Sequence, residues 1–115
     1  MKITLTDGKL PIVSISGEID HYNAYSVKEI VDKAISKDND LIIDLSEVVY
    51  IDTAGVGLLF AIVKTLLGVG RQLGLVLPDE NIKYIINIVG LTQINNMLVF
   101  NTLEEALRVM ESSTV

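Results

Sequence analysis

The four consecutive residues Asp52, Thr53, Ala54 and Gly55 lie where an apolar, strand-like run changes into a long apolar, helical one. This position places the Thr53 hydroxyl at the start of a helix. The first turn of a helix has unpaired N–H groups and carries the positive end of the helix dipole, so a phosphate group attached there would be stabilised. The alternative is that Thr53 only caps the helix, with its hydroxyl accepting a hydrogen bond from a first-turn N–H.

Few other residues are suited to catalysis, because the chain has no cysteine and a single histidine, His21. A hydrolase or transferase needs a nucleophile, a base and an orienting group within reach of one another. The candidates are Thr53, His21 and the carboxylates of Asp20, Asp44 and Asp52, which we expect at the carboxyl edge of a sheet. The alternatives are structural: Asp44 and Asp52 brace the loop predicted between them, and His21 lies in a surface loop.

Gly55 and Gly57 make the same segment resemble a glycine-rich phosphate loop. No GxxxxGK motif follows them, which excludes a nucleotide-binding P-loop, and we interpret the two glycines as room for close packing. The lack of cysteine and the single histidine exclude Cys-based and His-rich metal centres. The sequence therefore predicts neither a metal nor a cofactor.

The composition is that of one globular domain spanning residues 1–115, with 50% hydrophobic and 21% charged residues. A net charge of -6 argues against nucleic acid and anionic membranes as partners, since both are bound through clusters of Lys and Arg. The apolar run 54–70 contains a lysine and is slightly short for a membrane span, and the first ten residues do not resemble a signal peptide. We therefore expect a cytoplasmic protein.

Hydrophobic periodicity indicates the order of the elements. Strict alternation on both sides of an Asp-Gly turn predicts an N-terminal hairpin, and Asn23 is placed to cap the helix that follows. The apolar runs 41–45 and 73–77 read as inner strands, and the helix between them implies parallel pairing through a right-handed crossover.

The C-terminal half continues the same pattern. A helix capped by Asp79 and ended by Gly90 precedes a short strand at 97–100, and Thr102 with Glu105 forms a capping box for the last helix. The final residues, 112–115, are expected to fray. The predicted fold is α/β: a mixed, mostly parallel sheet of about five strands with about four helices.

The long helix after Thr53 is apolar on two sides. We expect Leu58, Leu59, Ile62 and Leu66 to face the core, which leaves Val56, Phe60, Val63 and Leu67 pointing elsewhere. In a chain of this size a second buried side would need a further layer of structure. The pattern therefore predicts an exposed docking surface beside the Thr53 hydroxyl.

Three segments resemble the STAS domains of anti-sigma factor antagonists: Gly17-Glu18-Ile19-Asp20-His21, the apolar strand 41–45, and Tyr50 through Gly57. The resemblance extends over nearly the whole chain, and its specific part is 52–57. Two positions differ from the commoner family pattern: the acceptor is Thr53 where serine is more usual, and Val56 stands where leucine is more usual.

The resemblance implies a mechanism and a set of site residues. In this family the hydroxyl after the aspartate, here Thr53, is phosphorylated by a GHKL-type serine/threonine kinase that is also an anti-sigma factor, and a phosphatase reverses the modification. The unphosphorylated protein binds the kinase and releases the sigma factor, and the phosphorylated form does not bind. The implied partner surface comprises Asp20, His21, Tyr22, Asn23, Asp52, Ala54, Val56, Gly57 and Phe60.

Two other functions are compatible with the sequence. The first is a small enzyme or nucleotide-binding protein that uses Asp20, His21 and Asp52, which would require a titratable pair within hydrogen-bonding distance in a concave, water-excluding pocket. The second keeps the STAS fold but places it in a stressosome-type scaffold or in the regulation of a transporter. Fold resemblance alone does not decide between these circuits.

Overall fold

The computed structural model describes residues 1–112 and contains five strands and four α-helices. In chain order the elements are β1 (Lys2–Thr6), β2 (Ile12–Ile19), α1 (Ala24–Ala34), β3 (Leu41–Ile51), α2 (Thr53–Gly68), β4 (Leu73–Val76), α3 (Glu80–Ile88), the 3-10 turn η1 (Leu91–Gln93), β5 (Met97–Phe100) and α4 (Leu103–Ser112). The predicted α/β class is confirmed. Of the residues expected to fray, Ser112 still belongs to α4, and 113–115 lie outside the described residues.

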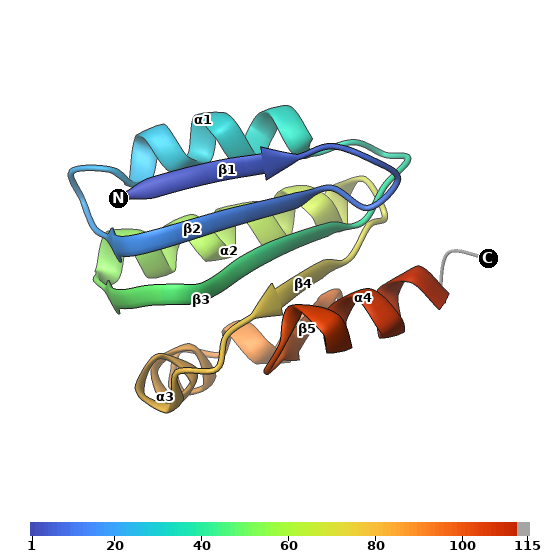
Figure 1. Ribbon diagram of the computed structural model, residues 1–115. Coiled ribbons are helices and arrows are strands. Elements are labelled where there is room, and N and C mark those ends of the chain that lie inside the picture. Colours follow the sequence, from blue (N-terminus) through green and yellow to red (C-terminus); the bar gives the residue numbers. More distant parts are fainter. Residues whose placement is uncertain (113–115) are drawn as a thin grey trace.

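The five strands form one sheet in the order β1-β2-β3-β4-β5 (Figure 1). β1 is antiparallel to β2, and every other neighbouring pair is parallel, as the sequence predicts. The hairpin turns at Gly8, which has a positive φ of 150° that glycine adopts without strain. Each parallel pair is joined by a helix, so the carboxyl ends of β2, β3, β4 and β5 share one edge of the sheet.

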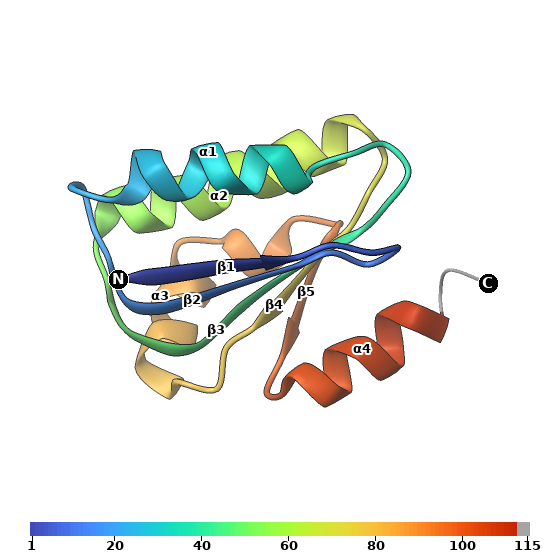
Figure 2. The same ribbon diagram turned by 45° about the horizontal axis from the view of Figure 1, so that its top comes forward.

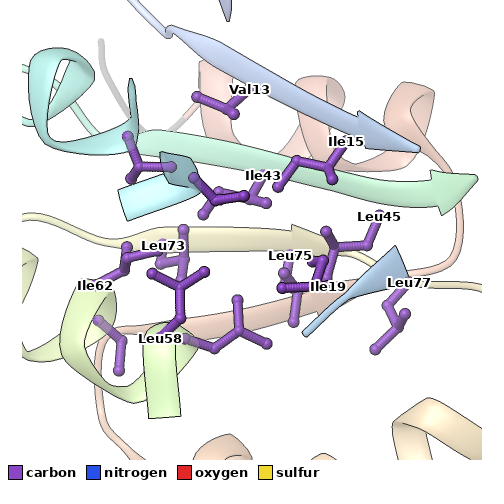
Figure 3. Close-up of a cluster of buried hydrophobic side chains, with 14 of the residues drawn as sticks. Val13, Ile15, Ile19, Ile43, Leu45, Leu58, Ile62, Leu73, Leu75 and Leu77 are labelled. Carbon is purple, nitrogen blue, oxygen red and sulfur yellow. The ribbon is translucent and has the colours of Figure 1, made fainter. Parts of the chain in front are cut away.

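The helices cover the two faces of the sheet unequally. α1 and α2 lie together on one face, and α4 lies on the opposite face (Figure 2). Alternate residues of β3 follow this division: Leu41, Ile43 and Leu45 belong to the larger core, and Ile42 belongs to a smaller one under α4. Figure 3 shows the larger core, where strand residues such as Ile43 and Leu75 meet Leu58 and Ile62 of α2. β3 is thus buried on both faces at its beginning, which explains its continuous apolar run.

The caps predicted for α3 and α4 are confirmed. The Ile82 N–H donates to the Asp79 carboxylate at 2.9 Å, and the Glu105 N–H donates to the Thr102 hydroxyl at 3.1 Å. Gly90 follows the end of α3 with a left-handed φ of 85°. The cap predicted for α1 is wrong: Asn23 precedes the helix, but its amide donates to the Glu18 carbonyl and its oxygen accepts from the Asp20 N–H.

β3 is longer than predicted, because residues 46–51 continue the strand and do not form a loop. Two bulges interrupt its pairing with β2. Ser14 and Ser16 pair with Asp44 and Glu47, so β3 has one extra residue there, and a second extra residue of β3 lies just before Tyr50. Such bulges place successive residues out of strict alternation, so the period-two signal disappears from the sequence. At the first bulge the Asp44 carboxylate accepts hydrogen bonds from the N–H and hydroxyl of Ser46. Asp44 therefore braces the strand, which agrees with the structural alternative, and lies away from the carboxyl edge.

The prediction for the long helix α2 is partly wrong. Val63 is fully buried together with Leu58, Leu59, Ile62 and Leu66, although it was expected on the outer side. Val56, which lies on the same side of α2 as Val63, borders a hollow with Ile85 and Val89 of α3. The Val63 carbonyl accepts a hydrogen bond from the buried Asn96 amide at 3.0 Å, so the segment before β5 covers this side of α2 without a further layer. Val56 and Phe60 are partly buried against the same core, and Leu67 is 50% exposed.

Within residues 1–112, no helix is long and apolar enough to cross a membrane.

Candidate functional site

The ends of β2 and β3 bring together two segments that the sequence analysis singled out. Ile19 and Ile51 are paired in the parallel ladder, and the Asp52 N–H donates to the Ile19 carbonyl at 3.1 Å. The loop after β2 and the start of α2 are therefore neighbours at the carboxyl edge of the sheet. Asp20, His21, Asp52 and Thr53 gather there as expected.

The Asp52 carboxylate connects these two segments. Its Oδ1 accepts a hydrogen bond from the Gly55 N–H at 3.0 Å, which makes Asp52 the N-cap of α2. Its Oδ2 accepts one from the His21 N–H at 3.0 Å and lies 3.3 Å from His21 Nδ1. The Gly55 N–H, followed by the contacts with His21, holds the pKa of Asp52 below its ordinary value of 3.8, so the carboxylate is charged at neutral pH.

Thr53 is the first residue of α2, and its side chain is exposed. Because Asp52 occupies the cap position, the alternative in which the Thr53 hydroxyl caps the helix is wrong. Among the described residues the hydroxyl has no hydrogen-bond partner. It lies exposed at the end of a helix whose dipole favours negative charge.

The loop Asp20–Asn23 is held by its own side chains. The Asp20 carboxylate accepts from the Tyr22 N–H at 3.0 Å and from the Asn23 N–H at 3.2 Å. These bonds leave Tyr22 85% exposed, with its ring centroid 4.0 Å from that of His21. The loop thus presents two neighbouring rings to solvent beside Asp52.

An open, largely apolar hollow lies on the other side of the first turn of α2, between α2 and α3. It is lined by Tyr50, Ile51, Asp52, Thr53, Val56, Ile85 and Val89. Ile85 and Val89 lie on the apolar stripe of α3, but they are 39% and 44% exposed. The sequence does contain a signal for this exposed apolar surface: α3 has more apolar residues than its contact with the core needs, since only Ile82 and Ile86 are buried.

The other residues expected in a partner surface are spread along α2. Ala54 is half-buried in the first turn, and Gly57 is exposed on the next. Phe60 lies further along, half-buried, with the Lys64 ammonium 5.9 Å from its ring centroid. The structure therefore concentrates the expected residues around Asp52 and Thr53 and leaves Phe60 at the periphery.

The two glycines of α2 have different roles. A Cβ at Gly55 would lie 2.5 Å from Ile51 Cγ1 and 2.9 Å from the Ile19 carbonyl oxygen, whereas a Cβ at Gly57 would meet no atom within 4 Å. Close packing is therefore the correct interpretation for Gly55 and the wrong one for Gly57. We expect Gly55→Ala to lower the free energy of unfolding by about 1–3 kcal/mol through overpacking.

Gly57→Ala is the matched control for this prediction. It should raise the free energy of unfolding by up to about 1 kcal/mol, because alanine is the better helix former and the site is open. Urea unfolding of the two variants and the parent measures both effects. Equal stability of the two variants would contradict the close contact at Gly55.

In the part of the chain that the structure describes, no three His, Cys, Asp or Glu side chains are grouped as a metal ion would require. The one close titratable pair at the edge, His21 and Asp52, is open to solvent on the histidine side, whose side chain is 64% exposed. The geometry is that of an exposed hydroxyl bordered by an aromatic loop and an apolar hollow.

A mixed five-stranded sheet with four helices agrees with a known class of domain. A STAS domain profile matches residues 2–106, and the chain belongs to the STAS domain family. An anti-sigma factor antagonist from Mycobacterium paratuberculosis has a similar structure, with a TM-score of 0.83 and 25% sequence identity over 96% of this chain and 93% of that one.

Two more distant structures share the fold. The Bacillus cell fate determinant SpoIIAA, solved in its phosphorylated form, matches with a TM-score of 0.69 and 21% identity over 94% of this chain and 98% of that one. The murine anion transporter Solute Carrier 26 family member A9 matches with a TM-score of 0.77 and 20% identity over 90% of this chain and 18% of its own. The same fold thus occurs in a protein about as short as this chain and as a small part of a transporter.

Proposed function

We propose that this chain, as a single STAS domain over residues 1–115, is an anti-sigma factor antagonist that acts in the cytoplasm. In its unphosphorylated form it binds an anti-sigma factor that is also a GHKL-type serine/threonine kinase, and the sigma factor is released. The kinase phosphorylates Thr53, which ends the interaction, and a phosphatase restores the binding form. Transcription is thereby regulated by partner switching.

The observation that carries the proposal is the free, exposed hydroxyl of Thr53 at the N-terminus of α2. A residue that only capped the helix would have its oxygen engaged by a backbone N–H, whereas here Asp52 provides that cap. The similarity to the Mycobacterium paratuberculosis antagonist over nearly the whole chain supports the same role.

The physics of the site supports release by phosphorylation. A phosphate on Thr53 adds about -1.5 to -2 charges beside the charged Asp52. The helix dipole stabilises that charge by about 0.3–1 kcal/mol, so the fold tolerates it. A partner that covered the apolar hollow would have to desolvate the same charge, which is much less favourable. The modification therefore acts by excluding the partner, without a large change of conformation.

The partner surface we propose has two parts around Thr53. One part is the loop with His21 and Tyr22, and the other is the hollow between α2 and α3. Exposed aromatic and aliphatic side chains around a central pocket are typical of binding hot spots.

A binding module is favoured over an enzyme by the surroundings of the His21–Asp52 pair. His21 is mostly exposed and does not line the hollow. The Asp20 carboxylate accepts hydrogen bonds from the backbone N–H groups of its own loop. An active site would hold such a pair in a water-excluding pocket. We therefore propose a non-enzymatic regulator.

The test begins with a pull-down that uses the unphosphorylated protein as bait, followed by incubation of the recovered partner with ATP. Mass spectrometry should then find one phosphate on the wild-type protein and none on Thr53→Ala. Thr53→Ser is the matched control and should accept one phosphate. A phosphate at another residue, or none on the wild type, would contradict the proposed function.

A further inference from the structure

Two adjacent residues compete for the cap of α2. Asp52 and Thr53 both have side chains that cap helices well, and each can reach the N–H three residues ahead. For Asp52 that group is the Gly55 N–H, and for Thr53 it is the Val56 N–H. In the structure Asp52 caps Gly55 at 3.0 Å, and the Val56 N–H donates to the Asp52 backbone carbonyl at 3.0 Å.

Contacts from outside the helix favour Asp52. Its second carboxylate oxygen accepts the His21 N–H at 3.0 Å and lies 3.3 Å from the His21 ring, across a separation of 31 residues. Its own N–H donates to the Ile19 carbonyl at 3.1 Å. Asp52 is therefore fixed to the end of β2 by its backbone and side chain, and the helix begins at Thr53.

The chosen cap determines the state of the Thr53 hydroxyl. With Asp52 as cap, the hydroxyl has no partner among the described residues and its oxygen lone pairs are available. If Thr53 became the cap, its oxygen would accept from the Val56 N–H and its rotamer would point into the helix end. A hydroxyl held in that way has one oxygen lone pair engaged and its rotamer fixed, so it is a poorer nucleophile for in-line attack on phosphorus.

We propose that Asp52 is a positioning residue for phosphorylation: by holding the cap of α2 it keeps the Thr53 hydroxyl free to act as the nucleophile. This inference rests on the proposed function and deepens it. In the reaction, Thr53 Oγ1 attacks the γ-phosphorus of ATP, the new O–P bond forms, the bond to the bridging oxygen breaks, and ADP leaves. The hydroxyl proton passes to a base of the kinase. Asp52 takes no part in these steps and acts only through the start of the helix.

The experiment compares Asp52→Ala with Asp52→Asn. Both variants lose the carboxylate that accepts the His21 N–H, but an asparagine oxygen can still accept the Gly55 N–H. Steady-state phosphorylation with the recovered kinase should show kcat reduced at least about tenfold in Asp52→Ala and kcat within about threefold of wild type in Asp52→Asn. Circular dichroism and thermal unfolding of the free variants establish that both are folded at the assay temperature.

A second measurement requires no kinase. Amide hydrogen exchange of the free proteins should show protection of the Gly55 N–H in the wild type and in Asp52→Asn. In Asp52→Ala that protection should be lost, and the Thr53 χ1 angle, followed by three-bond NMR couplings, should change as the Thr53 oxygen turns to accept the Val56 N–H; an unchanged χ1 would overturn the exchange of caps. Exposure of both amides in Asp52→Ala would show a frayed helix start and would overturn the exchange of caps.

The kinetic outcomes separate this inference from the proposed function. A wild-type protein that accepts no phosphate contradicts the proposed function and with it the role of Asp52. A phosphorylated wild type together with normal kcat in Asp52→Ala overturns only the positioning role. Equal loss of kcat in both variants would also overturn it, because the charge and not the cap would then be required. A rise in KM alone would identify Asp52 as a contact with the partner.

Discussion

Phosphorylation of Thr53 is expected to weaken binding of the anti-sigma kinase by about 100-fold or more. The phosphate would stand at the border of an apolar hollow, beside the charged Asp52, where a bound partner excludes water. Burial of an unpaired charge in an interface costs several kcal/mol, and each 1.4 kcal/mol corresponds to about a factor of ten in affinity. Isothermal titration of the kinase with the phosphorylated and unphosphorylated proteins measures the difference.

Thr53→Ala provides the control for this experiment. It removes the acceptor without adding charge, so it should bind within a few-fold of the unphosphorylated wild type. The thermal unfolding temperature of the phosphorylated protein should remain close to that of the parent, since the helix dipole favours the added charge. Equal affinity of the two phosphorylation states would show that Thr53 lies outside the interface.

The second large effect is expected at the hollow. Ile85→Asp should weaken binding of the unphosphorylated protein at least about tenfold, because a carboxylate replaces an aliphatic side chain that lines the hollow of the proposed contact. Ile85 is 39% exposed, so the new carboxylate reaches water in the free protein and the fold should be retained. The same titration measures the affinity, and circular dichroism of the free variant shows whether the fold is retained.

Ile88→Asp is the matched control on the same helix. Ile88 is 62% exposed and does not line the hollow, so its substitution repeats the charge and the helix context but should change affinity by less than about threefold. Equal effects of the two variants would mean that binding responds to overall charge and not to the hollow. Phe60→Asp is a less clear probe, because part of the Phe60 ring packs against the core and its loss would also affect folding.

Local signals in the sequence predicted most of the fold correctly. The alternation around the N-terminal turn, the continuous run that opens β3 and the caps at Asp79 and Thr102 are properties of single elements. They report how one element meets one face of the core. They fail where a strand leaves its regular period, as β3 does at its bulges, which made 46–51 look like a loop.

The functional site shows the same difference between local sequence signals and contacts made by distant segments. Local sequence patterns alone place Thr53 at the start of a long apolar helix and Asp20 and His21 at the end of a strand region, which in the structure is β2, ending at Ile19. That Asp52, and not Thr53, caps this helix follows from the folded structure, because the choice depends on His21 and Ile19 from a distant segment. The same long-range contacts bury Val63 and place Ile85 at the border of the hollow. Contacts between elements far apart in the chain leave no period in the sequence, and these contacts set the environment of the Thr53 hydroxyl.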